Sequence, residues 1–256
     1  MMNICVLQNA EGQQFCGWVR VGHRPAENTL SVTVSESLLP VLPEVLARIK
    51  NLFDLYCEPK AVYETLQVMN TLQPGLCVLG TRLPGCFNVF EMSVRAVLGQ
   101  QITVKAASTL AARLVAAYGT QVQTGIEGLT HSFPAPAAIL ALGENISEHL
   151  GKLGIISARA NTIYQLARVL ADEKNDFGFW GNPEEEMQKL QSIRGIGSWT
   201  AQYIAMRAMG WPDAFLPTDA GIKKALPDHT PKELQALSEA WRPWRSYATV
   251  NLWNTL

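Results

Sequence analysis

Cysteine pairs are missing from this sequence. Its five cysteines lie at Cys5, Cys16, Cys57, Cys77 and Cys86, and none belongs to a CxxC pair. An odd number without paired spacing argues against a disulfide framework and against a zinc site. Because none follows residue 86, the carboxyl-terminal part also lacks the four closely spaced cysteines that would hold an iron–sulfur cluster. We therefore interpret the cysteines as reduced thiols, most of them buried.

Long hydrophobic runs are missing as well. No stretch approaches the roughly 20 apolar residues that a membrane-spanning helix needs, and the amino terminus has no basic segment followed by an apolar one. The chain has 256 residues, of which 48% are hydrophobic, and this is enough for one large core or two modest ones. We therefore expect a globular, cytoplasmic protein with no membrane-bound part.

An excess of positive charge is the third absence. The formal net charge is −1, whereas proteins that bind nucleic acid usually contact phosphates through an evident excess of Lys and Arg. Composition alone therefore gives no support to nucleic-acid binding. Basic residues do gather in the last quarter of the chain, at Arg194, Arg207, Lys223, Lys224, Arg242 and Arg245. Their clustering is compatible with a local basic face.

Most of the chain is predicted to be helical. Residues 17–35 are rich in Val and Thr and contain a turn-like run at 24–28, which predicts a strand–turn–strand hairpin. From Pro43 onward, apolar residues recur at helical spacing. Helices are expected at 43–57, 60–69, 87–99, 103–118, 135–142, 157–171, 183–192, 198–209, 219–226, 231–240 and 243–254.

The chain is expected to divide near residue 80. Residues 75–85 are rich in glycine, and Pro74 and Pro84 interrupt regular structure there. We expect a small α+β domain at 1–80 and all-helical domains at 81–256. The fold class is therefore mostly α, with a small α+β part at the amino terminus.

The most informative stretch covers residues 190–204 and has the sequence LQSIRGIGSWTAQYI. It predicts a helix, a Gly-Ile-Gly turn and a second helix. Gly195 and Gly197 allow a tight turn and a close approach of the backbone to a partner. The second helix begins there with free N–H groups, and these suit an anion such as a DNA phosphate. By itself, however, a Gly-X-Gly turn is more often a plain corner between helices.

An aspartate follows this hairpin in the run Phe215-Leu216-Pro217-Thr218-Asp219. The periodic segment after it predicts that Thr218 caps a helix and that Asp219 lies in the first turn. A helix amino terminus favours the ionised form of a carboxyl group. Taken alone, Asp219 is more simply a helix cap, and it is the hairpin upstream that points to a catalytic carboxylate.

Together, the hairpin and Asp219 resemble the helix-hairpin-helix (HhH-GPD) DNA glycosylase superfamily, whose motif ends in a Gly/Pro-rich loop and one catalytic aspartate. The resemblance covers roughly residues 50–256, and residues 52–57, 83–86, 95–100 and 241–248 are similar to AlkA-type 3-methyladenine DNA glycosylases. It implies a helix-hairpin-helix glycosylase fold with the lesion cleft between two helical subdomains. The family's amino-terminal α+β domain looks truncated here, with its pattern resuming near Gly17.

The resemblance also implies a reaction. Cleavage of an N-glycosidic bond builds positive charge on the sugar, which the carboxylate of Asp219 would stabilise. Family members that form a Schiff base and cut the strand have a lysine where this chain has Trp199. We therefore expect a monofunctional enzyme that removes alkylated purines from double-stranded DNA, works as a monomer and leaves an abasic site.

Further site residues are implied by the same resemblance. The base pocket would contain Trp199, Tyr203 and Trp253, whose rings can stack on electron-poor bases. The DNA-binding hairpin would use Gly195, Ile196, Gly197, Ser198 and Thr200. The wedge that fills the gap left by the flipped nucleotide would be Gln101. No cofactor is expected except a structural monovalent cation, sodium or potassium, on the backbone carbonyls of Gln191, Ile193 and Ile196.

Two departures from the family pattern keep other functions open. The wedge position is aliphatic in the family and is Gln101 here, while the residue after the aspartate is aromatic in AlkA-type enzymes and is Ala220 here. One alternative is a duplex-binding module that has lost catalysis. Another is a glycosylase for oxidised purines, although Trp199 and the carboxyl-terminal pattern argue against it.

Overall fold

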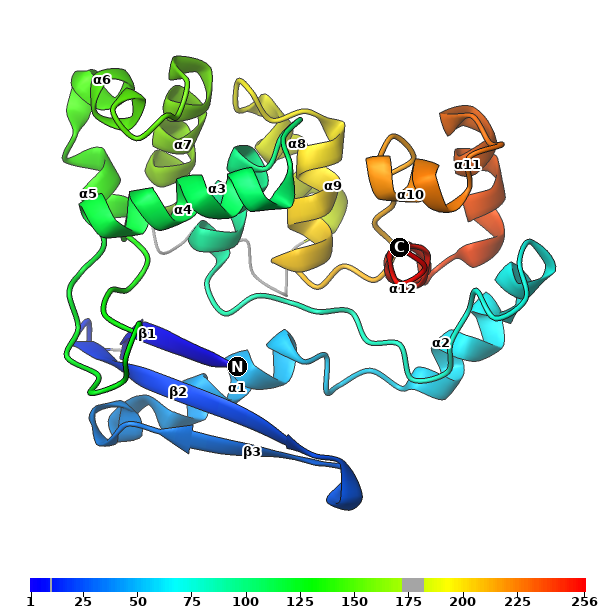
Figure 1. The fold of residues 1–256 in the computed structure, drawn as a ribbon, viewed down its shortest axis with the longest axis horizontal. Coiled ribbons are helices and arrows are strands. Elements are labelled where there is room, and N and C mark those ends of the chain that lie inside the picture. The colour runs from blue at the N-terminus through cyan, green and yellow to red at the C-terminus, as the bar shows by residue number, and fades with distance from the viewer. Residues whose placement is uncertain (10, 172–181) are drawn as a thin grey trace.

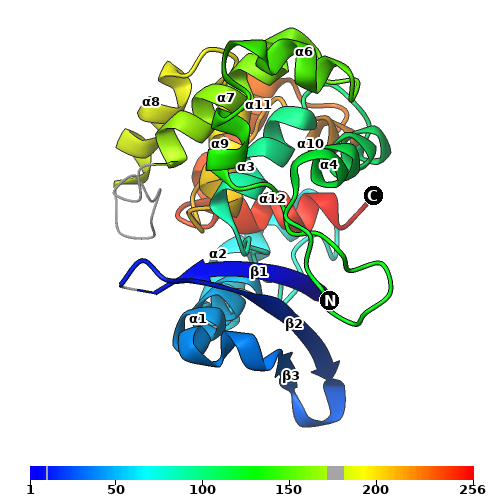
Figure 2. The same cartoon turned by 90° about the vertical axis from the view of Figure 1, so that its left-hand side faces the viewer.

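A computed structural model describes residues 1–9, 11–171 and 182–256 of the chain. The fold is mostly helical, with a small antiparallel sheet below most of the helices (Figures 1 and 2). The sheet contains β1 (Met2–Gln8), β2 (Gln14–Arg24) and β3 (Thr29–Val34) in the order β1-β2-β3. The predicted hairpin at 17–35 is confirmed as β2 and β3, joined by a short 3-10 turn at Pro25–Glu27.

Strand β1 was missed by sequence analysis, which placed the start of the sheet at residue 17. Residues 4–7 form an unbroken apolar run and show no alternation that would separate one face of a strand from the other. In the structure, Cys5 and Leu7 are buried in the core beneath the sheet. Cys5 pairs with Gly17 of β2, and this register determines which side chains of β1 face the core.

The predicted helices all have counterparts in the structure. Their bounds are α1 (Leu42–Leu52), α2 (Pro59–Leu66), α3 (Val89–Leu98), α4 (Val104–Tyr118), α5 (Pro136–Leu140), α6 (Ile146–Gly151), α7 (Ser157–Leu170), α8 (Pro183–Ser192), α9 (Ser198–Arg207), α10 (Ala220–Ala225), α11 (Pro231–Ser238) and α12 (Arg245–Trp253). Helix α6 was not predicted, because six residues are too few to establish a period.

The first helix is shorter than the predicted 43–57. Asp54 adopts a positive φ of 52°, which ends the helical path of the backbone. This conformation is held in place because the Asp54 carboxylate accepts hydrogen bonds from the backbone N–H of Leu83 and the hydroxyl of Tyr247, both at 2.9 Å. These two partners are distant in sequence, so the break could not be predicted from local pattern.

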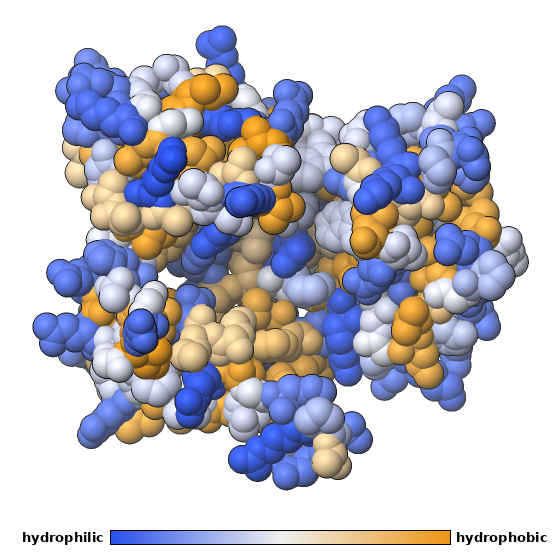
Figure 3. Space-filling view, viewed as in Figure 1, coloured by the Kyte–Doolittle hydropathy of each residue, from blue (hydrophilic) through white to orange (hydrophobic). Residues whose placement is uncertain are grey.

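The buried side chains form three clusters. One lies under the sheet and includes Val19, Val45 and Phe87. A second joins helices α3 to α9, and a third joins α2 to residues between Met206 and Leu252. Helix α9 therefore contributes to two clusters, and Tyr203 packs against both. In Figure 1, α9 stands between the helical groups, and Figure 3 shows hydrophobic side chains near the middle of the same face.

Two further observations concern the chain as a whole. Helix α2 falls inside the predicted domain at 1–80, yet it packs into the cluster formed by the carboxyl-terminal helices. Among the residues that the structure describes, no helix is both long enough and apolar enough to cross a membrane.

Candidate active site

Asp219 is the amino-terminal cap of α10. Its φ and ψ of −64° and 137° are extended, and its Oδ1 accepts hydrogen bonds from the backbone N–H groups of Gly221 at 2.9 Å and Ile222 at 3.1 Å. The prediction that Thr218 caps this helix is therefore wrong by one residue. The short side chain of aspartate, on extended backbone, reaches the free N–H groups of the first turn.

Two indoles complete the surroundings of this carboxylate. Trp253 Nε1 donates to Oδ1 at 2.8 Å, and Trp199 Nε1 donates to Oδ2 at 3.0 Å. Asp219 is only 9% exposed, so its charge has little contact with water. All four partners are donors, and such hydrogen bonds to a carboxylate are stronger than those between neutral groups. The carboxylate is therefore held in one orientation by residues far apart in sequence.

The predicted pocket aromatics come together around Asp219. The rings of Trp199 and Tyr203 are stacked, with centroids 5.2 Å apart and planes 9° from parallel. Trp253 approaches Tyr203 from α12, with ring centroids 6.3 Å apart. All three side chains are half-buried. They thus form an aromatic surface beside the carboxylate, which could stack on a planar base.

Two neighbours of this surface were missed by the sequence analysis. The guanidinium of Arg207 lies 5.8 Å from the centre of the Tyr203 ring, four residues along the same helix. A Cβ at Gly221 would lie 2.7 Å from Trp253 Cδ1 and 3.0 Å from Asp219 Oδ1, so only glycine fits there. The spacing of four residues could have indicated Arg207, but nothing local marks Gly221.

The predicted hairpin is present between α8 and α9, and its two glycines differ. Gly195 has a φ of 97°, and a Cβ there would lie 2.1 Å from Thr162 Oγ1. Thr162 needs this position because its hydroxyl donates to the carbonyl of Arg194 at 2.9 Å. Gly197 precedes α9 with an ordinary φ of −86° and has open space where a Cβ would be. Gly195 thus shapes the turn, while Gly197 leaves room in front of the helix.

The other hairpin residues divide between the interior and the surface. Ile196 and Thr200 are buried, at 4% and 3% exposure, whereas Ser198 is exposed. Ile196 and Thr200 therefore offer little surface to a partner. Since no side chain caps α9, the N–H groups of its first turn stay available to an anion.

The loop that follows α3 is bound to this hairpin. Gln100 Nε2 donates to the carbonyl of Gly195 and to Thr200 Oγ1, both at 2.9 Å, and the Gln100 carbonyl accepts a hydrogen bond from Arg159. The next residue, Gln101, is exposed and has a φ of 53°. A non-glycine residue at positive φ is strained and persists where its surroundings enforce it. The predicted wedge residue therefore lies on a fixed loop beside the hairpin.

The three carbonyls predicted to hold a cation are not equivalent. The carbonyl of Ile193 accepts the N–H of Ile196 at 3.0 Å. Within the described parts of the chain, no hydrogen bond reaches the carbonyls of Gln191 or Ile196, whereas that of Gly195 is taken by Gln100. Two unpaired carbonyl oxygens in one turn fit the needs of a hard cation.

Loss of one indole hydrogen bond gives a first prediction. In Trp253→Phe the ring remains to stack, but Oδ1 of Asp219 loses its donor at 2.8 Å. If the site releases bases from DNA, as the sequence resemblance implies, the single-turnover rate of base release should fall about tenfold, the equivalent of one hydrogen bond to a charged group, with little change in DNA affinity. Trp18→Phe in β2 removes the same indole far from Asp219 and should leave the rate unchanged. Equal rates in both variants would contradict this role for the indole N–H.

Comparison with known proteins identifies the class to which this site belongs. The model of the HhH-GPD superfamily of base excision DNA repair proteins matches residues 94–243, which include α9, the hairpin and Asp219. The chain therefore belongs to the HhH-GPD superfamily of base excision DNA repair proteins.

A second match makes the type of enzyme more specific. The model of the AlkA N-terminal domain matches residues 6–88, so the expectation that the family pattern resumes only near Gly17 is wrong. DNA-3-methyladenine glycosylase 2 of Escherichia coli is 38% identical over 230 residues, which cover 90% of this chain and 78% of that protein. The two family matches and this relative show that the chain is an AlkA-type DNA glycosylase.

Solved structures share the fold. A 3-methyladenine DNA-glycosylase from Archaeoglobus fulgidus superimposes with a TM-score of 0.77 at 21% identity, covering 98% of this chain and 85% of that one. An 8-oxoguanine glycosylase/lyase from Clostridium acetobutylicum in complex with double-stranded DNA gives 0.71 at 17% identity, covering 98% and 86%. At these identities the likeness concerns the fold alone.

Proposed function

We propose that this protein is a monofunctional glycosylase that flips alkylated purines of the 3-methyladenine class out of double-stranded DNA and hydrolyses the N-glycosidic bond. The product is an abasic site. The observation that carries this proposal is the Asp219 carboxylate, held between two indole N–H groups at the edge of an aromatic surface. The protein acts on one lesion at a time as a monomer, on DNA in the cytoplasm.

The surroundings of the Asp219 carboxylate support this reaction. As the bond to the base breaks, positive charge develops on the deoxyribose, and a fixed anion lowers the energy of that state. Because the indoles and backbone N–H groups already orient Asp219, no reorganisation is needed at the moment of reaction. The groups that contact it are indoles and amides, none of them an amine that could attack the sugar. This supports hydrolysis without a lyase step.

The aromatic surface supplies the preference for damaged bases. Alkylation on a ring nitrogen leaves a purine electron-poor or cationic and weakens its bond to the sugar. Such a base stacks favourably on the electron-rich faces of Trp199, Tyr203 and Trp253. The free-energy cost of extruding a base from the duplex is also lowest for a base that pairs poorly.

The hairpin and the loop beside it would bind the duplex. A phosphate fits the first turn of α9, where Gly197 leaves space and no side chain caps the helix. The exposed Gln101 would fill the gap left by the flipped nucleotide and hydrogen-bond to the orphaned partner base. A sodium or potassium ion on the carbonyls of Gln191, Ile193 and Ile196 would add positive charge where the phosphate binds.

The two alternatives have less support. A module without catalysis is not favoured, because the relative that is 38% identical is named a glycosylase. For oxidised purines, the likeness to the 8-oxoguanine enzyme is at the level of fold, and the relative that is 38% identical is named for 3-methyladenine.

A panel of duplexes tests the proposal. Each duplex contains 3-methyladenine, hypoxanthine, 8-oxoguanine or no lesion, and the free base released is measured together with strand breaks before and after alkali. We expect release of the first two bases, with breaks only after alkali. Release of 8-oxoguanine alone would favour the oxidised-purine alternative, duplex binding without release would favour the inactive module, and breaks without alkali would contradict the monofunctional mechanism.

A further inference from the structure

Helix α12 contacts both ends of the segment that presents Asp219. The segment comprises residues 213–219 and ends at the cap of α10; residues 208–212 connect it to the end of α9. Arg245, the first residue of α12, binds Asp213, and Trp253, its last residue, binds Asp219. Since a helix rises about 1.5 Å per residue, these two anchors are separated by a fixed distance of about 12 Å.

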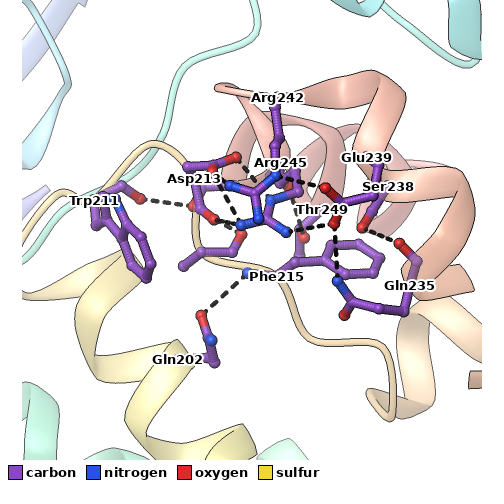
Figure 4. A network of polar contacts seen from close by, with 12 residues as sticks. Gln202, Trp211, Asp213, Phe215, Gln235, Ser238, Glu239, Arg242, Arg245 and Thr249 are labelled. Atoms are coloured by element: carbon purple, nitrogen blue, oxygen red, sulfur yellow. Dashed lines mark hydrogen bonds and ion pairs between the residues drawn. The ribbon is translucent and has the colours of Figure 1, made fainter. Parts of the chain in front are cut away.

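The contact between Arg245 and Asp213 is a buried, multiply bonded ion pair (Figure 4). Both residues are nearly inaccessible, at 6% and 7% exposure. Arg245 Nε donates to Oδ1 of Asp213 at 2.7 Å, and its Nη2 donates to Oδ2 at 2.9 Å and to the backbone carbonyl at 2.8 Å. The planar guanidinium thus fixes both the side chain and the backbone at the start of the segment.

Neighbouring contacts remove the remaining freedom of the segment. The hydroxyl of Ser246 donates to the carbonyls of Trp211 and Ala214, at 2.7 and 3.1 Å. The backbone N–H of Phe215 donates to Gln202 Oε1 at 3.2 Å, which ties the segment to α9 (Figure 4). Ala214, Phe215 and Leu216 are buried, and the Leu216 carbonyl accepts the N–H of Asp219 at 2.9 Å, so a displacement of Asp213 would be transmitted through these residues to Asp219.

Helix α12 is itself held on another face. The side-chain oxygen of Asn251 accepts hydrogen bonds from the Val78 N–H at 3.1 Å and from Thr81 Oγ1 at 2.8 Å. Tyr247 donates to Asp54, and burial raises the pKa values of both groups. These contacts fix α12 against residues 54–81. Because α12 is fixed, its bonds to Asp213 and Asp219 also fix the position of the segment.

We propose that Arg245 and Asp213 are positioning residues for base excision, acting through Asp219 and touching neither the DNA nor the base. This inference rests on the function proposed above for Asp219. The ion pair holds the segment so that the carboxylate faces the sugar, and a small displacement of a reacting group can lower a rate by orders of magnitude.

The test compares Arg245→Lys and Asp213→Asn with the wild-type protein. A lysine keeps the charge, but its single ammonium nitrogen cannot reproduce the planar fork with which the guanidinium bonds both carboxylate oxygens and the carbonyl. We expect the single-turnover rate of base release from a duplex with hypoxanthine to fall 10- to 100-fold, with unchanged affinity for a duplex that contains an abasic-site analogue. Arg48→Lys is the matched control, because Arg48 also bonds a carboxylate and a backbone carbonyl, in α1, and its rate should stay at the wild-type value.

A double-mutant cycle separates positioning from a general loss of structure. If Arg245 acts through Asp219, adding Arg245→Lys to Asp219→Asn causes no further loss of rate. An equal loss in both backgrounds, or wild-type rates in both single variants, overturns the inference. If Arg245→Lys fails to fold, the same cycle is run with Asp213→Asn, whose side chain keeps its shape. When Asp219→Asn itself releases base at the wild-type rate, it is the proposed function that fails.

Discussion

Replacement of Asp219 by asparagine is expected to lower the single-turnover rate of base release by about 10³-fold, near the upper end of the effect of removing one electrostatic group from an active site. The developing positive charge on the sugar would then face a neutral amide. Affinity for a duplex with an abasic-site analogue should change little, because the hairpin and its loop are not altered.

The geometry of Asp219 also predicts a cost in stability for this variant. Four donors surround the carboxylate, and an asparagine turns an NH2 group towards one side of that set. At least one donor then has no acceptor, which costs about 1–3 kcal/mol. Asp228→Asn, an exposed acid-to-amide change nearby, is the control and should affect neither the rate nor the unfolding free energy. A rate for Asp219→Asn within a few-fold of wild type would remove the carboxylate from the mechanism.

Gly195→Ala is expected to have the second large effect. A Cβ would lie 2.1 Å from the hydroxyl of the buried Thr162, and the backbone φ of 97° is unfavourable for any other residue. We expect the free energy of unfolding to fall by roughly 2–4 kcal/mol. We also expect DNA affinity to fall at least about tenfold, because the turn can no longer present the first N–H groups of α9.

Gly197→Ala provides the contrast to that variant. The backbone there is ordinary, and the added methyl group meets no protein atom within 4 Å. Stability should change by less than about 1 kcal/mol, but the methyl group projects in front of α9, and duplex affinity should still fall about tenfold. Chemical denaturation and fluorescence anisotropy with a labelled duplex measure the two quantities. Loss of stability in both variants, or retained affinity in Gly197→Ala, would contradict the assigned division of roles.

Sequence analysis predicted those parts of the site that are encoded locally. The Gly-Ile-Gly turn and the aspartate after a Gly/Pro-rich loop are short patterns, and the spacing of four residues places Trp199 and Tyr203 on one face of a helix. That their rings stack on each other is seen only in the structure. The indole hydrogen bonds to Asp219 could not be predicted, because they join residues 20 and 34 positions apart.

The errors in the predicted fold have the same origin. The end of α1 depends on Asp54, whose partners lie near residue 83 and on α12. The buried face of β1 depends on its pairing with β2. The helix cap at 219 was misplaced by one residue because Thr218 and Asp219 are both good caps, and only the backbone conformation distinguishes them.

The position of α9 between two buried clusters has a mechanical consequence. Tyr203 packs against both clusters, and Trp199 on α9 and Trp253 on α12 bond the same carboxylate. A rotation of α9 relative to α12 would therefore disturb the indole hydrogen bonds that orient Asp219. Under the proposed function, the protein would keep this geometry on binding, and the free-energy cost of reaching a base inside the duplex would be paid by bending and unstacking the DNA.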